Sequence, residues 1–256
     1  MNYQRWIDHF EANRLGRVEP DWDAPFNLPE GKRRALARSL AEYQLGDGGG
    51  PCRLIARDAE TFRASRDEAR LVVDLWFAEE REHSRLLSGA VRRLKGTFVQ
   101  ETFAFRMFCC VRRTLGVQFE MLVLLIVEIV STGYYRLIRS HADDEPIAAM
   151  CKLILRDEAG HIAFHRARLA AWYPNGVSRG WEVMFHLLGY ACAIFLWLGH
   201  GREFRAIGAH RGELFCHVRS GLHVFLRKLK RDIQETRTRA IQIQTGSGVG
   251  MRVLGI

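Results

Sequence analysis

Apolar residues recur every three or four positions along most of the chain, which is the spacing of amphipathic helices. Strands would alternate apolar and polar residues, and the sequence holds no such run of useful length. Proline and glycine are sparse and gather in "VEPDWDAPFNLP" (18–29) and "GDGGGP" (46–51). The pattern therefore predicts an all-α protein. The predicted helices cover residues 3–15, 31–62 (disturbed at 46–51), 66–94, 117–140, 145–172, 179–198 and 202–236.

Two helix starts carry capping residues. In "SRDE" (65–68), Ser65 is a predicted N-cap with Glu68 reaching back to it. In "DDEP" (143–146), an aspartate cap precedes an early proline. We therefore expect two antiparallel hairpins, turning near residues 63–65 and 142–144. Residues 95–116 would form one long crossover between the hairpins.

Ionisable residues interrupt the apolar face of the helix predicted over residues 66–94. Glu80 and His83 lie on that face, one helical turn apart, whereas Glu79, Arg81 and Glu82 fall outside it. We expect Glu80 and His83 to face the core and the other three to face water. The remaining members of the face are Val72, Trp76, Leu87, Ala90 and Leu94.

The helix over residues 145–172 repeats the arrangement, because Glu158 and His161 share a face with Ile147, Cys151 and Ile154. With 18 glutamates and 10 histidines in 256 residues, chance predicts about 0.7 Glu-x-x-His pairs, so one pair alone means little. Two pairs on core faces favour a shared function over ordinary buried salt bridges.

The segment "MLVLLIVEIV" (121–130) is apolar nearly all round, so we expect it to be buried. Glu128 is its only charge, and an unpaired buried carboxylate is costly unless a cation lies nearby. Glu120, just before the segment, is expected at the surface.

The predicted turns place a carboxylate opposite each Glu-x-x-His pair. The midpoint of Glu128 and Glu158 is residue 143, and the residue level with Glu80 is close to Asp47. Glu42 is an alternative to Asp47, although it lies five residues earlier and about 140° round the helix. A solvated helix break is the other interpretation of Asp47. Four carboxylates and two imidazoles are the ligand set of a di-iron or di-manganese site. That predicted set is Asp47, Glu80, His83, Glu128, Glu158 and His161.

Four segments resemble the ferritin-like superfamily, and its rubrerythrin-like branch most closely. They are "EREHSRLL" (80–87), "DEAGHIAFH" (157–165), "YQLGDGGG" (43–50) and "VEIVSTGYY" (127–135). The resemblance spans residues 31–172 and implies a ferritin-like four-helix bundle with one long crossover. Residues 1–30 would add an N-terminal helix and linker, and residues 173–256 a C-terminal helical extension.

The resemblance implies two iron ions, with manganese as an alternative, and an oxidoreductase that activates oxygen or peroxide. Glu80 and Glu158 would bridge the ions, and His83 and His161 would each bind one. We expect His165 to lie beside the ligands or to form a structural hydrogen bond near them. We place Tyr135 in the same surroundings; for Tyr134 or Tyr135 a ligand hydrogen bond, a radical and ordinary core packing all remain open.

Several departures limit the resemblance. The first-helix ligand is Asp47 instead of glutamate, and glycines and Pro51 follow it. No rubredoxin-like domain is encoded, so the electron donor is unknown. Ile154 stands where the superfamily's arylamine N-oxygenases carry a further histidine, which disfavours that activity.

Composition bears on partners and location. The net charge is +9, but 33 of the 38 basic residues are arginine and no nucleic-acid motif accompanies them, so nucleic acid is not an expected partner. The six cysteines form no C-x-x-C pair, and the first residues lack a signal-peptide core, so we expect a cytoplasmic protein. The run "LLGYACAIFLWLG" (187–199) predicts a buried helix and an apolar substrate pocket, not a membrane span.

Two other functions remain open. One is a ferritin-like binding protein, with or without metal, that acts through its basic C-terminal helices. The other is a hydroxylase acting on tRNA. A homodimer is one alternative for the oligomeric state.

Overall fold

The computed structural model describes residues 2–47, 66–99, 103, 106–107 and 117–249. Every regular element in these ranges is an α-helix, which confirms the all-α prediction. The helices are α1 (Gln4–Leu15), α2 (Glu30–Asp47), α4 (Arg66–Arg93), α6 (Val117–His141), α7 (Glu145–Trp172), α8 (Arg179–Ala206) and α9 (Arg211–Val249).

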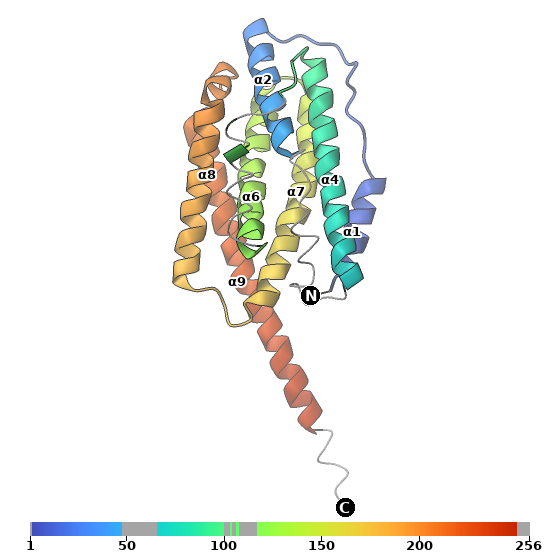
Figure 1. Cartoon of the computed structure of the whole chain (residues 1–256), viewed down its shortest axis with the longest axis vertical. Coiled ribbons are helices and arrows are strands. Elements are labelled where there is room, and N and C mark those ends of the chain that lie inside the picture. Colours follow the sequence, from blue (N-terminus) through green and yellow to red (C-terminus); the bar gives the residue numbers. More distant parts are fainter. Residues whose placement is uncertain (1, 48–65, 100–102, 104–105, 108–116, 250–256) are drawn as a thin grey trace, which may run out of the picture.

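The helices lie side by side along the long axis of the molecule (Figure 1). Helix α2 packs against α4, α6 against α7, and α4 against α7. Helix α1 covers α4 and part of α7 on one flank, whereas α8 and α9 cover α2, α6 and α7 on the other. Helix α6 is therefore enclosed on most sides, and the far end of α9 extends beyond the bundle.

The turn between α6 and α7 forms where the sequence predicts it. Asp144 is the N-cap of α7, with extended backbone angles, and its carboxylate accepts a hydrogen bond from the Ile147 amide at 3.1 Å. Asp143 before it has a φ of 51°, a left-handed conformation that aspartate tolerates better than most residues. Arg93 pairs with the Asp144 carboxylate at 2.9 Å and ties the turn to the end of α4. The other predicted turn and its cap Ser65 lie outside the described residues.

The boundary between the last two helices was predicted wrongly. Helix α8 continues through Gly199 and Gly201 to Ala206, and α9 runs from Arg211 to Val249. Gly201 is buried within α8, and an added Cβ would meet the Trp197 ring at 3.1 Å, so the lack of a side chain lets that ring lie against the helix. The chain turns instead at Gly208, whose φ is +87°, a conformation that glycine adopts without strain.

The apolar core has two parts. The larger lies among α2, α6, α8, α9, the second half of α4 and both ends of α7, and the smaller joins α1 to the first half of α4, with Met121 of α6 and Phe164 of α7. On α4 the small cluster ends at Trp76 and the large one begins at Leu86, so Glu80 and His83 fall between them. On α4 a polar layer thus separates the two clusters, whereas the large cluster continues past this level on α6 through Leu122 and Leu125 and on α7 through Leu169.

The predicted faces agree with the observed burial, with three exceptions. All apolar members of the predicted α4 and α7 faces are buried. Glu79 and Glu120, expected in water, are only 4% and 1% exposed, because α1 covers that flank of α4 and α6 is enclosed by its neighbours. The run 187–199 forms a helix but is not buried as a whole, because only one side of α8 packs against the bundle.

A buried polar cluster connects α2, α6 and α8 away from the polar layer. Tyr43 stacks on Tyr134 with ring centroids 3.7 Å apart, and the Tyr43 hydroxyl lies 2.7 Å from Ser131 Oγ. Ser39 Oγ lies 3.0 Å from both the Tyr134 hydroxyl and His200 Nδ1. Burial lowers the pKa of His200 to about 4, so this imidazole is neutral at pH 7.

We expect His200→Gln to reduce the loss of stability on acidification. The folded state disfavours the protonated imidazole, so the unfolded state takes up the proton first, and stability falls as pH drops from about 6.5 towards 4. Between pH 7 and pH 5 this group should cost the wild type about 2 kcal/mol. Urea unfolding at both values measures the difference. The same substitution at exposed His223 is the control, and an identical pH dependence in His200→Gln would contradict the account.

Candidate metal centre

The two Glu-x-x-His segments face each other where α4 packs against α7. His83 Nδ1 lies 3.6 Å from Glu80 Oε2 and 3.8 Å from Glu158 Oε1. His161 Nδ1 lies 3.0 Å from Glu80 Oε1 and 3.6 Å from Glu158 Oε2. Each of these two glutamates therefore directs one oxygen towards each imidazole, and both carboxylates lie between the two rings.

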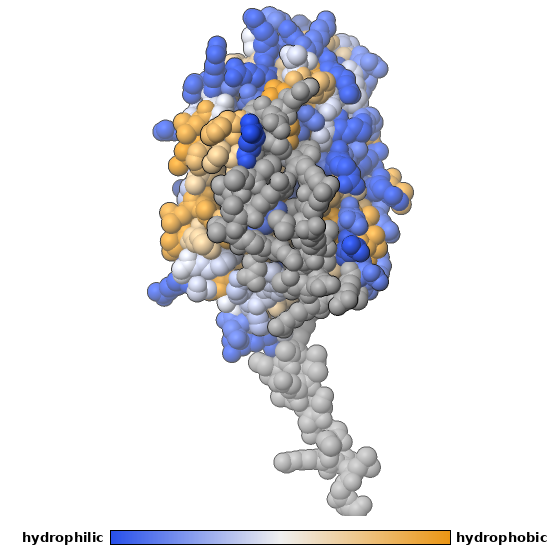
Figure 2. Space-filling view, viewed as in Figure 1, coloured by the Kyte–Doolittle hydropathy of each residue, from blue (hydrophilic) through white to orange (hydrophobic). Residues whose placement is uncertain are grey.

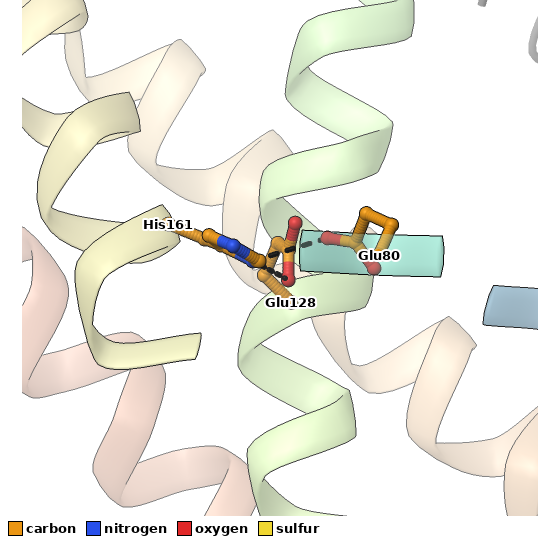
Figure 3. Close-up of side chains that lie close together, drawn as sticks. All are labelled: Glu80, Glu128 and His161. Atoms are coloured by element: carbon orange, nitrogen blue, oxygen red, sulfur yellow. Dashed lines mark ion pairs between the residues drawn. The ribbon is translucent and has the colours of Figure 1, made fainter. Parts of the chain in front are cut away.

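Glu128 joins the group from α6, on the side of His161. Its Oε2 lies 3.4 Å from His161 Nδ1. Figure 3 shows Glu80, Glu128 and His161 converging from three different helices. One ligand atom from each of these three residues lies within 4.8 Å of the others, an arrangement that could hold a metal ion.

The far nitrogens of both rings are held by a second pair of carboxylates. His83 Nε2 lies 3.2 Å from Asp157 Oδ2, and His161 Nε2 lies 3.0 Å from Glu79 Oε2. Because a carboxylate can only accept, Nε2 carries the proton and donates in both contacts. Each acid directly precedes the glutamate of one segment and holds the histidine of the other. The hydrogen bonds therefore tie α4 and α7 together reciprocally.

The near nitrogens have carboxylate neighbours but no hydrogen-bond partner. Nδ1 of His83 and Nδ1 of His161 are both buried, and no contact around them has hydrogen-bond geometry. With Nε2 as the donor, a neutral ring would turn its Nδ1 lone pair towards carboxylate oxygens. Lone pairs facing carboxylates need a cation among them, either a proton on each ring or a metal ion.

The pKa shifts express the same need for positive charge. Burial would lower the pKa of His83, but Asp157 and Glu80 raise it to about 9. Burial likewise opposes protonation of His161, and Glu128 and Glu80 nevertheless raise its pKa well above the ordinary value. Without a metal ion, the surrounding carboxylates therefore favour the protonated, positively charged form of both imidazoles.

The glutamates respond in opposite directions. Burial, reinforced by Glu128, raises the pKa of Glu158 well above its ordinary value. Burial also acts to raise the pKa of Glu80, but His161 outweighs it and holds that pKa below the ordinary value. The surroundings thus favour the neutral acid form of Glu158 and the carboxylate form of Glu80, because adjacent negative charges with little access to water repel.

The end of α2 lies at the level of this group. Asp47 is the last residue of α2, and its side chain lies outside the described residues. Gln44 donates to Ser84 Oγ at 2.8 Å, and the same antiparallel register places residue 47 level with residue 81. By the same reasoning, the contact between Tyr43 and Ser131 places residue 47 level with residue 127 of α6. The backbone of Asp47 is therefore level with both Glu80 and Glu128.

The other residues singled out by the sequence lie further away. Glu42, the alternative to Asp47, approaches Arg38 at 3.4 Å and His200 at 4.0 Å instead. His165 is buried with its ring edge-on to Trp76, at 5.0 Å, and the Trp76 indole donates to Glu80 Oε1 at 3.0 Å. His165 thus adjoins the group through Trp76.

Tyr135 packs in the core against two other tyrosines. Its ring lies 5.4 Å from Tyr43 and 5.3 Å from Tyr134, both edge-on. This is the cluster that also contains Ser39 and His200, and on α2 it lies between the middle of the helix and Asp47.

Sequence reasoning missed the outer carboxylates and the arginine between them. Arg17 Nη2 lies 2.7 Å from Asp157 Oδ2 and 3.8 Å from Glu79 Oε1, so one guanidinium neutralises both. The signal was present in "EEREH" (79–83) and "DEAGH" (157–161), where an acid precedes each glutamate. Arg17 itself follows α1, and no periodicity connects it to these helices.

Gly160 allows α1 to close this side of the site. A Cβ at residue 160 would meet His9 Nε2 at 2.3 Å. The Phe10 ring lies 6.0 Å from the His161 ring. Helix α1 therefore forms a wall beside the two histidines.

Comparisons of the chain with models of known families, with curated proteins and with solved structures find no match.

We expect Arg17→Gln to destabilise the protein by about 2 kcal/mol, because it leaves two buried carboxylates without their shared cation. Asp157→Asn should remove part of that penalty, so the double variant should lose less than the sum of the single losses. Urea unfolding measures all three variants. Arg14→Gln, at an exposed position in α1, is the matched control. Strict additivity of the two substitutions would refute the coupling.

Proposed function

We propose that this chain is a ferritin-like di-iron carboxylate protein, an oxidoreductase that activates oxygen or peroxide. One observation carries the proposal: two buried imidazoles turn Nδ1 towards the same two glutamates, while their Nε2 atoms are held by other carboxylates. Metal-binding histidines in proteins are commonly oriented in this way, by a carboxylate on the nitrogen that does not bind the metal.

The side chains suit two ions better than one. Glu80 and Glu158 would contact both ions, His83 one, and His161 and Glu128 the other. The level of Asp47 makes it the candidate to complete the set beside His83. Carboxylates and imidazoles in a helical bundle suit iron or manganese. The unpaired Nδ1 atoms and the unpaired Glu158 Oε2 would then serve as ligands.

The order of the helices supports the ferritin-like arrangement. The pair α2–α4 supplies one Glu-x-x-His helix and the pair α6–α7 supplies the other. Contacts from Gln44 to Ser84 and from Arg33 to the Leu94 carbonyl oxygen make α2 antiparallel to α4. The segment joining α4 to α6 lies largely outside the described residues, so the long crossover stays a prediction.

Iron(II) at such a site would supply electrons to oxygen or peroxide at its open coordination positions. The chain's own residues would prepare that site. Glu79 and Asp157 fix both imidazoles with the proton on Nε2. The Trp76 N–H holds Oε1 of Glu80. Glu158, whose pKa burial raises, would bind the ions as a carboxylate, so metal binding would favour loss of its proton.

The apolar clusters next to the polar layer would limit the access of bulk water to the reacting atoms. An apolar small molecule remains the candidate substrate class, and the electron donor remains to be identified.

Iron binding is the direct test. The purified protein should bind two iron(II) ions per chain under anaerobic conditions, and oxygen should then produce a visible absorption band. His83→Ala and His161→Ala should each lower the stoichiometry, because each removes a ligand. His223→Ala, an exposed histidine on α9, is the matched control. Less than one bound iron in the wild type, with both ligand variants unchanged, would rule the site out. Bound iron without oxygen consumption would favour the binding-protein alternative.

The outer carboxylates should influence iron affinity without binding it. We expect Glu79→Gln and Asp157→Asn each to weaken iron binding about 10- to 100-fold, because they loosen the hold on an imidazole that remains in place. The stoichiometry at saturation should not change. Glu82→Gln, on the same helix but paired with Arg85 near the surface, is the control. Unaltered affinity in both outer variants would contradict the positioning role.

A further inference from the structure

Helix α8 carries a continuous apolar face that the bundle does not cover. Two helices, Phe119–His141 and Arg179–Ala206, are long and apolar enough to cross a membrane, but 72% of the first window is buried and only 17% of the second. Six large apolar side chains of α8 are exposed, with Phe195 and Leu198 more than 70% exposed. They are Val183, Met184, Leu187, Ile194, Phe195 and Leu198.

These six residues occupy one side of the helix. At 100° per residue they fall within a sector about 120° wide, and they extend over about 22 Å of helix axis. Figure 2 shows the corresponding apolar surface along the α8 flank of the molecule. Single exposed apolar residues are ordinary, but a contiguous face of this kind marks a binding surface.

The opposite side of α8 is firmly docked, so the helix cannot leave the bundle without cost. Phe185, Gly189 and Phe204 are buried, and a Cβ at residue 189 would meet the Leu222 side chain of α9 at 2.7 Å. Helix α8 is therefore apolar on two sides. One side packs against the bundle, and the other side is exposed. This arrangement suits a helix that lies on a bilayer and not one that crosses it.

The charges around the apolar face of α8 indicate the chemistry of its partner. Arg179 is exposed at one end of α8, and Arg202 and Arg205 are exposed at the other, on the same side as the apolar residues. The two acidic residues of α8 are both engaged elsewhere: Glu182 with Lys230 at 2.8 Å, and Glu203, which is buried, with Arg38 at 3.5 Å. The apolar face therefore has arginines at both ends and no carboxylate on it.

A second copy of the chain is a poor occupant for this face. In a two-fold pairing of antiparallel α8 helices, Arg202 of one copy would lie beside Arg179 of the other, with no acid on the face to separate them. An anionic lipid surface instead offers phosphates to both ends and acyl chains to the middle. The net charge of +9 acts in the same direction. We propose that α8 attaches the protein flat to a bilayer rich in anionic lipid.

Vesicle flotation with the full-length chain tests this attachment. The probes are vesicles of phosphatidylcholine alone and of an equal mixture with phosphatidylglycerol. Wild type should float with the mixed vesicles, and its binding to the neutral vesicles should be at least about tenfold weaker. Phe195→Glu combined with Leu198→Glu should reduce binding to mixed vesicles by at least about tenfold, since it places charge in the apolar sector. Arg202→Gln combined with Arg205→Gln should reduce binding to the mixed vesicles by about tenfold.

Matched controls separate the face from general changes in charge. Leu15→Glu alters an apolar residue that is 82% exposed on α1, and Arg14→Gln with Arg70→Gln removes two exposed arginines elsewhere. Neither control should weaken flotation by more than the effect that its lower net charge has on binding to anionic lipid. Circular dichroism confirms that each variant is folded. Three results would overturn the proposal: no wild-type binding to mixed vesicles, binding unaffected by the α8 glutamates, or a wild-type dimer that these glutamates dissociate.

Discussion

Charge balance at the polar layer governs the rest of the structure. Four buried acidic side chains, the partly buried Glu80 and two buried imidazoles lie at one level, where several carboxylates would repel one another strongly if nothing neutralised them. The fold supplies cations from two sides: the imidazoles inside the group and the guanidinium of Arg17 outside it. Helix α1 and the segment after it are needed in their observed places because that guanidinium must reach Asp157 and Glu79.

The layer is organised as two interlocking halves. Each of α4 and α7 carries an acid, a glutamate and a histidine in the same order, and the acid of each helix holds the histidine of the other. The symmetry is incomplete, because Glu128 stands on the His161 side in the middle of a helix, whereas the corresponding position on the His83 side falls at the end of α2. The two imidazoles therefore have unequal surroundings, as sites that treat two ions differently would require.

The sequence predicts what depends on local periodicity. Most helix spans, the buried faces of α4 and α7 and the turn at Asp144 follow from spacing along one helix or one hairpin. The convergence of Glu80, Glu128 and His161 follows from the spacing along three helices together with the predicted turns. The failures share a different cause. Glu79 lies outside the apolar sector of α4, and it is buried because α1, distant in sequence, covers it. The outer face of α8 fails for the converse reason, since an apolar run predicts burial but does not reveal that only half of it has a partner. Arg17 has no sequence signal at all, because a single arginine in a linker matches no pattern.

The division of the apolar core also bears on how the molecule comes apart. On α4 the small cluster around Trp6, Phe10 and Trp76 is separated from the large cluster, which begins at Leu86, by polar residues that join α4 to α7 through charge and hydrogen bonds. The two ends of α4 thus belong to different apolar clusters, whereas α7 contributes to the large cluster at both of its ends. Ions held by ligands from α2, α4, α6 and α7 would cross-link these four helices, so that metal loading and the stability of the bundle would rise together.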